Sequence, residues 1–140
     1  YIRVGRNAVE DVYDSVPESF QMDKALTVRE GTDVTLIACG ELVRPALDAA
    51  LLLEEKGISA RVIDMYCVKP LDREAVLQAA RETKAIVTAE EHSLYGGMGS
   101  MVSQVVGESH PIPVKNLALP DEPAIAGKSA EVFAHYGLDA

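Results

Sequence analysis

Glu90-Glu91-His92 follows an apolar segment, and three residues separate it from the glycine turn Gly96-Gly97-Met98-Gly99. Carboxylates and an imidazole can exchange protons near neutral pH, and α/β sheets usually hold ligands where strands end. The turn could bind phosphate through the first amides of the following helix, but its spacing differs from Gly-x-Gly-x-x-Gly and two acids precede it. We therefore interpret six residues as structural turn and interface positions, with phosphate or nucleotide binding as the alternative. These residues are Glu90, Glu91, His92, Gly96, Gly97 and Gly99.

Cysteine and histidine raise the question of a metal site. Cys39 and Cys67 lie at the ends of expected strands and His92 follows another, so all three could lie near the same end of the sheet, and three such ligands would hold zinc if they converged. Buried cysteines more often behave as small apolar side chains, and two cysteines do not make a disulfide scaffold. We therefore predict no metal site on this chain.

The composition limits the classes of protein to consider. The chain has 140 residues, 48% of them apolar and 25% charged, which is typical of one globular domain. Its formal net charge of -9 and its scattered Lys and Arg residues disfavour a nucleic-acid partner. No apolar run approaches the ~20 residues of a membrane span, and no signal peptide is visible. We therefore expect a cytoplasmic protein that does not cross a membrane.

Apolar periodicity predicts alternating strands and helices. The expected strands lie at residues 24–29, 34–39, 60–68, 84–89 and 112–119. Gly57 should end the first helix, and Gly107 the helix that follows the glycine turn. Asp72 and Ser129 are expected N-caps of the second and the last helix. The first helix should bury Val43, Ala46, Leu47, Ala50 and Leu51.

The connections between these elements predict the architecture. A tight polar turn at residues 30–33 suggests a hairpin between strands 24–29 and 34–39, with the first strand at an edge of the sheet. Right-handed crossovers should make the other four strands parallel, with helices on both faces. We predict a three-layer α/β/α sandwich around a mixed five-stranded sheet with one antiparallel edge strand.

Several segments together resemble a known family, the C-terminal domain of transketolase-like thiamine-diphosphate enzymes. They are REGTDVTLIACGELV at residues 29–43, GISARVIDMYCVKPLD at 57–72 and AIVTAEEHSLYGGMGS at 85–100. The last resembles the family's acid-acid-His/Asn-x-x-x-Gly-Gly-x-Gly pattern, seen in deoxyxylulose-phosphate synthases and split transketolases. YIRVGR at residues 1–6 resembles the end of a pyrimidine-binding domain, and GKSAEVFAHYGL at 127–138 resembles the family's terminal segment.

The resemblance implies part of a transferase that moves two-carbon ketol units between sugar phosphates of the pentose phosphate type. It implies thiamine diphosphate and Mg²⁺ in the whole enzyme, with no catalytic and no cofactor-binding residue on this chain. The partners implied are the remaining transketolase domains or a separate N-terminal subunit, in a homodimer. We expect the 140-residue chain alone to be inactive.

The resemblance also implies a substrate contact and a domain boundary. Arg3 or Arg6 would bind the phosphate end of the substrate, because a guanidinium fork fits phosphate well. Residues 1–23 would be the tail of a preceding pyrimidine-binding domain plus a linker, and residues 24–140 the C-terminal domain. The chain opens on Tyr1 within an expected strand, so we expect a piece of a longer protein.

Two other functions remain open from the sequence. A free-standing α/β module could bind a small ligand or nucleotide at the turn Gly96-Gly97-Met98-Gly99. A fragment of a 2-oxo-acid dehydrogenase β subunit would share the fold and differ in substrate. Direct nucleotide binding would distinguish the first, and an upstream pyrimidine domain with an activating glutamate would support the transketolase interpretation.

Overall fold

The computed structural model describes residues 2, 9–17 and 20–140, so Arg3 and Arg6 lie outside the described residues. The strands are β1 (Leu26–Arg29), β2 (Val34–Ala38), β3 (Ala60–Asp64), β4 (Ile86–Ser93) and β5 (Val114–Leu119). The α-helices are α1 (Val43–Glu55), α2 (Arg73–Glu82), α3 (Met98–Ser109) and α4 (Ser129–Tyr136). A short 3₁₀ turn, η1 (Gly40–Leu42), leads from β2 into α1.

The five strands form one mixed sheet in the order β1-β3-β2-β4-β5. Strands β3, β2, β4 and β5 are parallel, and β1 lies antiparallel to β3 at the edge, as the sequence predicts. The predicted hairpin is wrong, because β1 pairs with β3 and not with β2. Both edges of β2 are occupied by parallel neighbours, so β2 has no free edge for a hairpin, and the incoming strand bonds to the outer edge of β3 instead.

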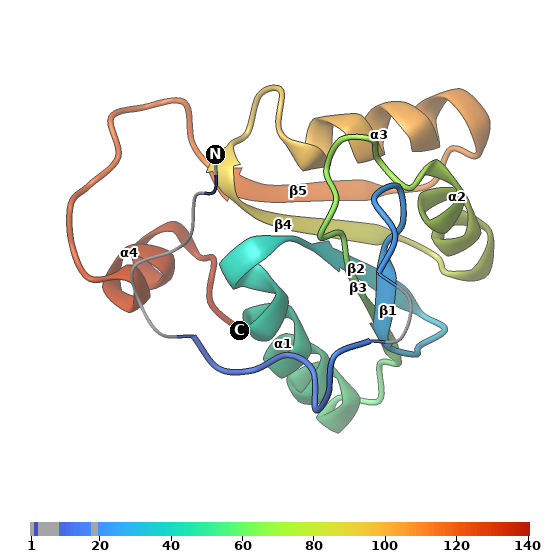
Figure 1. Ribbon diagram of the computed structural model, residues 1–140, viewed down its shortest axis with the longest axis horizontal. Helices are drawn as coiled ribbons and strands as arrows, with labels where there is room; N and C mark the ends of the chain where they lie inside the picture. The colour runs from blue at the N-terminus through green and yellow to red at the C-terminus, as the bar shows by residue number, and fades with distance from the viewer. Residues whose placement is uncertain (1, 3–8, 18–19) are drawn as a thin grey trace.

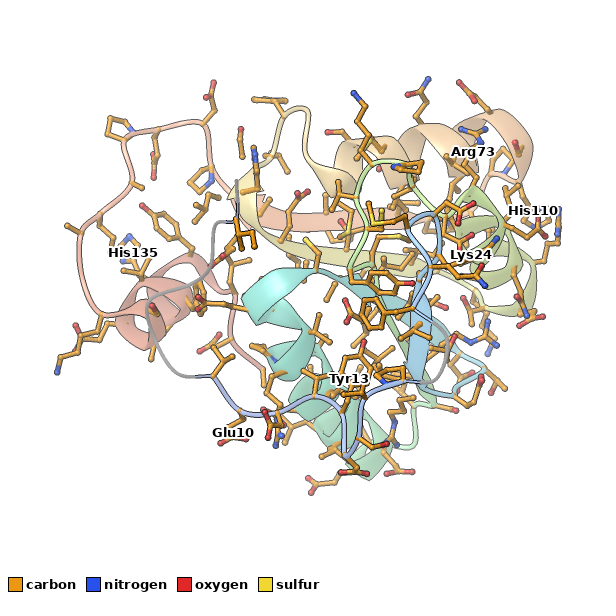
Figure 2. The ribbon with its side chains drawn as sticks, viewed as in Figure 1. Glu10, Tyr13, Lys24, Arg73, His110 and His135 are labelled. Atoms are coloured by element: carbon orange, nitrogen blue, oxygen red, sulfur yellow. The ribbon has the colours of Figure 1, made fainter. Side chains whose placement is uncertain are left out.

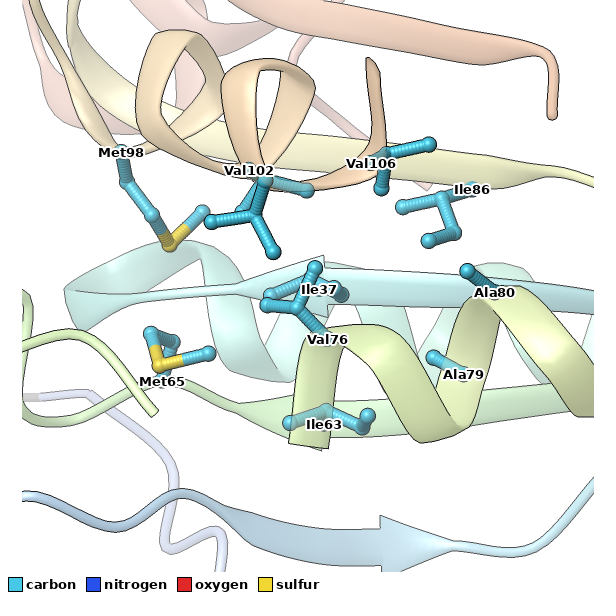
Figure 3. Packing of buried hydrophobic residues seen from close by; sticks show 11 residues of the cluster. Ile37, Ile63, Met65, Val76, Ala79, Ala80, Ile86, Met98, Val102 and Val106 are labelled. Atoms are coloured by element: carbon cyan, nitrogen blue, oxygen red, sulfur yellow. The ribbon is translucent and has the colours of Figure 1, made fainter. Parts of the chain in front are cut away.

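Helices cover both faces of the sheet (Figure 1), and a hydrophobic core lies on each face. Along β2 the side chains alternate, so that Ile37 lies in one core while Leu36 and Ala38 lie in the other. Figure 3 shows side chains of the sheet, α2 and α3 meeting in the first core. Its members are Ile37, Ile63, Met65, Val76, Ala79, Ala80, Ile86, Met98, Val102, Val105 and Val106. The second core lies beneath α1, and Phe133 and Tyr136 of α4 pack against it.

Most local signals agree with the observed helix ends. The Asp72 carboxylate accepts a hydrogen bond from the Ala75 amide and caps α2, and α1 ends at Lys56 and Gly57 as expected. Helix α3 continues past Gly107 to Ser109, because a helical glycine only weakens a helix and does not stop it. The N-cap position of α4 is Lys128 rather than Ser129, which is the first helical residue.

One predicted core residue lies on the surface. Leu51 keeps 51% of its surface exposed, whereas Val43, Ala46 and Ala50 are buried. The small side chains of the two alanines let α1 rest closely on the sheet along a narrow line, and Leu51 falls outside that line. Among the described residues, no helix is both long and apolar enough to cross a bilayer.

Candidate functional site

The carboxyl end of β4 extends beyond its neighbour β2. The last paired residues of these two strands are Ala38 and Ala89, but β4 continues to Ser93 alongside β5. This extension is longer than predicted, because Ser93 still pairs with Leu119 and the Leu94 amide bonds to the Leu119 carbonyl at 2.9 Å. It carries the acid-acid-histidine segment out of the sheet toward the glycine turn.

Glu90 is the buried member of this segment, with only 3% of its surface exposed. One carboxylate oxygen accepts a hydrogen bond from the Met98 amide and the other from the Gly99 amide, both at 2.7 Å. These amides open α3, where the helix dipole favours negative charge. The side chain of Glu90 therefore occupies the position at which a phosphate would bind this helix.

The glycines of the turn make room for this contact. A Cβ at position 97 would overlap the carboxylate of Glu90, and one at position 99 would overlap the hydroxyl of Thr88. Gly96 adopts a φ of 76°, and its amide donates to the Ser100 hydroxyl at 3.1 Å. The Gly-Gly-x-Gly pattern is thus explained by close packing of the turn on β4.

A polar network that the sequence did not indicate holds α3 on the sheet. The Thr88 hydroxyl of β4 donates to the Asn116 side-chain oxygen of β5 at 2.9 Å. The Asn116 amide nitrogen donates in turn to the Ser103 hydroxyl of α3 at 3.1 Å. Thr88 and Asn116 fall within expected strands of the sequence, but only the register of β4 and β5 brings them together.

Glu91 and His92 are exposed on the extension of β4. The His92 Nδ1 accepts a hydrogen bond from the Ser93 amide at 2.6 Å, which leaves Nε2 as the ring nitrogen that can donate or exchange a proton. Because Glu90 is directed into the protein and these two side chains are directed outward, the three residues do not form one acid/base cluster. They divide into a structural carboxylate and a surface pair.

The cysteines do not add reactive chemistry to this edge. Burial, with a smaller contribution from the carboxylate of Glu90 and then Asp64, raises the pKa of the Cys39 thiol to about 11. The thiol therefore stays protonated at neutral pH and is a weak nucleophile and metal ligand. Cys67 is buried, and no group of three His, Cys, Asp or Glu side chains that could hold a metal occurs among the described residues.

The connector before β1 is tied to the sheet, a feature that its composition did not reveal. The Tyr13 hydroxyl donates a short hydrogen bond to the carboxylate of Asp64, the last residue of β3. Burial raises the pKa of Asp64. Burial also raises the pKa of Tyr13, and the hydrogen bond to Asp64 raises it further. Figure 2 shows Tyr13 and Glu10 on the segment that passes α1 on its way to β1.

A second attachment of the connector follows the first. The Phe20 and Tyr66 rings lie 4.1 Å apart between centroids, and the Tyr66 hydroxyl donates to the Gln21 carbonyl at 2.7 Å. The Ala25 amide then donates to Asp72 at 3.0 Å. The connection between β3 and α2 therefore supplies the residues that hold the chain as it enters β1.

This fold and this turn define a class of protein. The family described as "Transketolase, C-terminal domain" matches residues 23–140, and the chain belongs to that family.

Relatives with known names and structures agree with the assignment. The chain is 52% identical over 139 residues to an apulose-4-phosphate transketolase subunit of Phocaeicola vulgatus, covering 99% of this chain and 44% of that protein. It is 40% identical to "6-deoxy-6-sulfo-D-fructose transketolase subunit SqwH" of Clostridium sp. (strain MSTE9), covering 100% of this chain and 43% of that protein. A solved structure described as "Split gene transketolase, inactive beta4 tetramer" superposes with a TM-score of 0.86 at 42% identity, covering 96% of this chain and 43% of that chain. The chain thus spans less than half the length of these relatives.

Proposed function

We propose that this chain is the C-terminal domain of one subunit of a split transketolase-type enzyme. The enzyme would transfer a two-carbon ketol unit from a phosphorylated ketose to an aldose acceptor. The observation that carries the proposal is similarity along the whole chain, connector included, to two proteins named as transketolase subunits. The connector contacts at Tyr13 and Tyr66 support it, because they join residues before the matched domain to the domain itself.

Thiamine diphosphate and Mg²⁺ would act in the assembled enzyme and not on the described part of this chain. The amides at the start of α3 already bind Glu90, and no cluster of three metal-ligating side chains occurs among the described residues. The described residues therefore do not fit a diphosphate–metal group. We propose that the rest of the enzyme holds the cofactor and that this domain is structural.

The proposed partners are a separate N-terminal subunit and a second copy of the subunit that contains this chain. One structural relative is described as a β4 tetramer, which means that this relative self-associates. Residues 1–23 would belong to a preceding pyrimidine-binding domain and its linker, and Arg3 or Arg6 would contact substrate phosphate. We place the assembled enzyme in the cytoplasm.

The alternative functions gain no comparable support. A nucleotide-binding module would need the helix amides that Glu90 occupies. A 2-oxo-acid dehydrogenase fragment would share the fold, but the relatives that cover this chain end to end are transketolase subunits.

The test is reconstitution of activity. The subunit that contains this chain is purified and mixed with the N-terminal transketolase subunit of the same organism, and ketol transfer to an aldose is measured. We expect activity only when both subunits, thiamine diphosphate and Mg²⁺ are present. No transfer in any mixture, together with tight nucleotide binding by the chain alone in calorimetry, would contradict the proposal.

A further inference from the structure

Helix α1 exposes large apolar side chains, unlike the other helices that the structure describes. Leu51 and Leu52 keep 51% and 47% of their surface exposed, while the other exposed large apolar residues of the described chain lie outside helices and strands. Exposed apolar side chains on a rigid helix are typical of an interaction surface when they adjoin further apolar surface.

Leu51 adjoins such a surface, a shallow groove between α1 and the edge strand β1. Leu47 lies one helical turn before Leu51, and Val28 of β1 lies opposite. Arginine and aspartate side chains form the rim of the groove. The lining residues are Val28, Arg29, Arg44, Leu47, Asp48 and Leu51.

This face of α1 carries a cationic side chain, Arg44, near its start and an anionic one, Glu55, at its end. Arg44 lies one turn before Leu47, where it holds Asp48 and Glu10 of its own chain at 3.1 Å each. Glu55 lies one turn after Leu51, is exposed, and forms no ion pair within the part of the chain that the structure describes. Arg44 and Glu55 are separated by about 16 Å along the helix, so they cannot pair within one chain.

We propose that two copies of this chain pack through α1 in antiparallel orientation, around a twofold axis between Leu47 and Leu51. Each Leu51 then enters the groove of the second copy, and each Arg44 faces Glu55 of the second copy. A twofold contact needs such a self-complementary surface, in which the same residues serve both partners. The inference rests on the self-association within the proposed function and names the surface that carries it.

The contact should be weak in this chain by itself. A helix of thirteen residues is about 20 Å long and covers less than the ~800 Å² per partner of a standard interface. Trapping by disulfide formation detects such a contact, because the reaction requires two thiols to approach closely. An equimolar mixture of Leu47→Cys and Leu51→Cys chains should form linked dimers at least ~10-fold faster than Gln104→Cys chains, whose exposed cysteine lies on α3.

Charge exchange tests the orientation. The charge exchanges are made in the Leu47→Cys and Leu51→Cys chains. Arg44→Glu or Glu55→Arg alone should slow the formation of linked dimers about 3- to 10-fold, and both changes together should restore most of the rate. Far-UV circular dichroism and thermal melting confirm that each variant is folded. The wild-type chain, with native Cys39 and Cys67, gives the background rate.

The outcomes separate this inference from the proposed function. Trapping no faster than in Gln104→Cys, or a double exchange that fails to restore the rate, would overturn the α1 contact. Reconstituted ketol transfer would be unaffected by that result. Conversely, rapid trapping without reconstituted activity would support the contact and count against the enzymatic assignment.

Discussion

The carboxylate of Glu90 is the group whose replacement tests the site most directly. Both of its oxygens accept amide hydrogen bonds of 2.7 Å at the start of α3, and the residue is 3% exposed. Glu90→Gln keeps the shape but replaces one acceptor by an NH₂ group that faces an amide donor. One buried amide is then left without an acceptor.

The expected loss follows from these contacts. A hydrogen bond to a charged group contributes roughly 1.5–3 kcal/mol, and the favourable interaction with the helix dipole contributes up to about 2 kcal/mol. Removing a buried charge also removes its desolvation cost, which offsets part of the loss. We expect Glu90→Gln to lower the free energy of unfolding by about 2–3 kcal/mol.

Urea unfolding at neutral pH measures this change, and Glu122→Gln is the control because it makes the same chemical change at an exposed loop position. The control should change stability by less than ~0.5 kcal/mol. A second variant, Glu90→Ala, vacates the helix amides, so added sulfate should recover part of its lost stability. If Glu90→Gln were as stable as Glu122→Gln, the idea of an internal anion at α3 would be refuted.

Three further predictions concern the same turn, the connector and the substrate. Gly97→Ala should destabilise the protein by about 2–4 kcal/mol in urea unfolding, because its Cβ would overlap the Glu90 carboxylate; Gly107→Ala, where nothing lies near, should be neutral or stabilising. Burial raises the pKa of Asp64 in the folded state, so its contribution to stability is present below the unfolded pKa and is lost as the pH rises through the folded pKa. The free energy of unfolding of the wild type relative to Asp64→Asn should therefore fall from pH ~4 upward, and a difference independent of pH would contradict this. In the assembled enzyme, Arg3→Ala or Arg6→Ala should raise KM for a phosphorylated acceptor about 10- to 100-fold with little change for a non-phosphorylated one, and equal effects on both acceptors would argue against phosphate contact.

Local patterns in the sequence were sufficient to predict most of the secondary structure. Periodicity and capping are local effects, so a few neighbouring residues are enough to indicate an element. The apolar run at residues 34–38 indicates β2 in this way, and the glycine turn before Met98 indicates the start of α3. The mixed sheet with its antiparallel edge strand also follows from the order of these signals, whereas the family was indicated by the resemblance of several segments to known sequences. Glu90 and the three glycines could be singled out as candidates for the same reason.

The tertiary structure alone decided which of these residues meet. β1 bonds to β3 because β2 has no free edge, and Glu90 binds α3 because β4 extends past the sheet beside β5. The bond between Tyr13 and Asp64 joins residues far apart in the sequence, and the exposure of Leu51 depends on how closely α1 approaches the sheet. Each of these features is a contact between elements, set by strand order and packing distance, and residue type and local spacing contain no record of either.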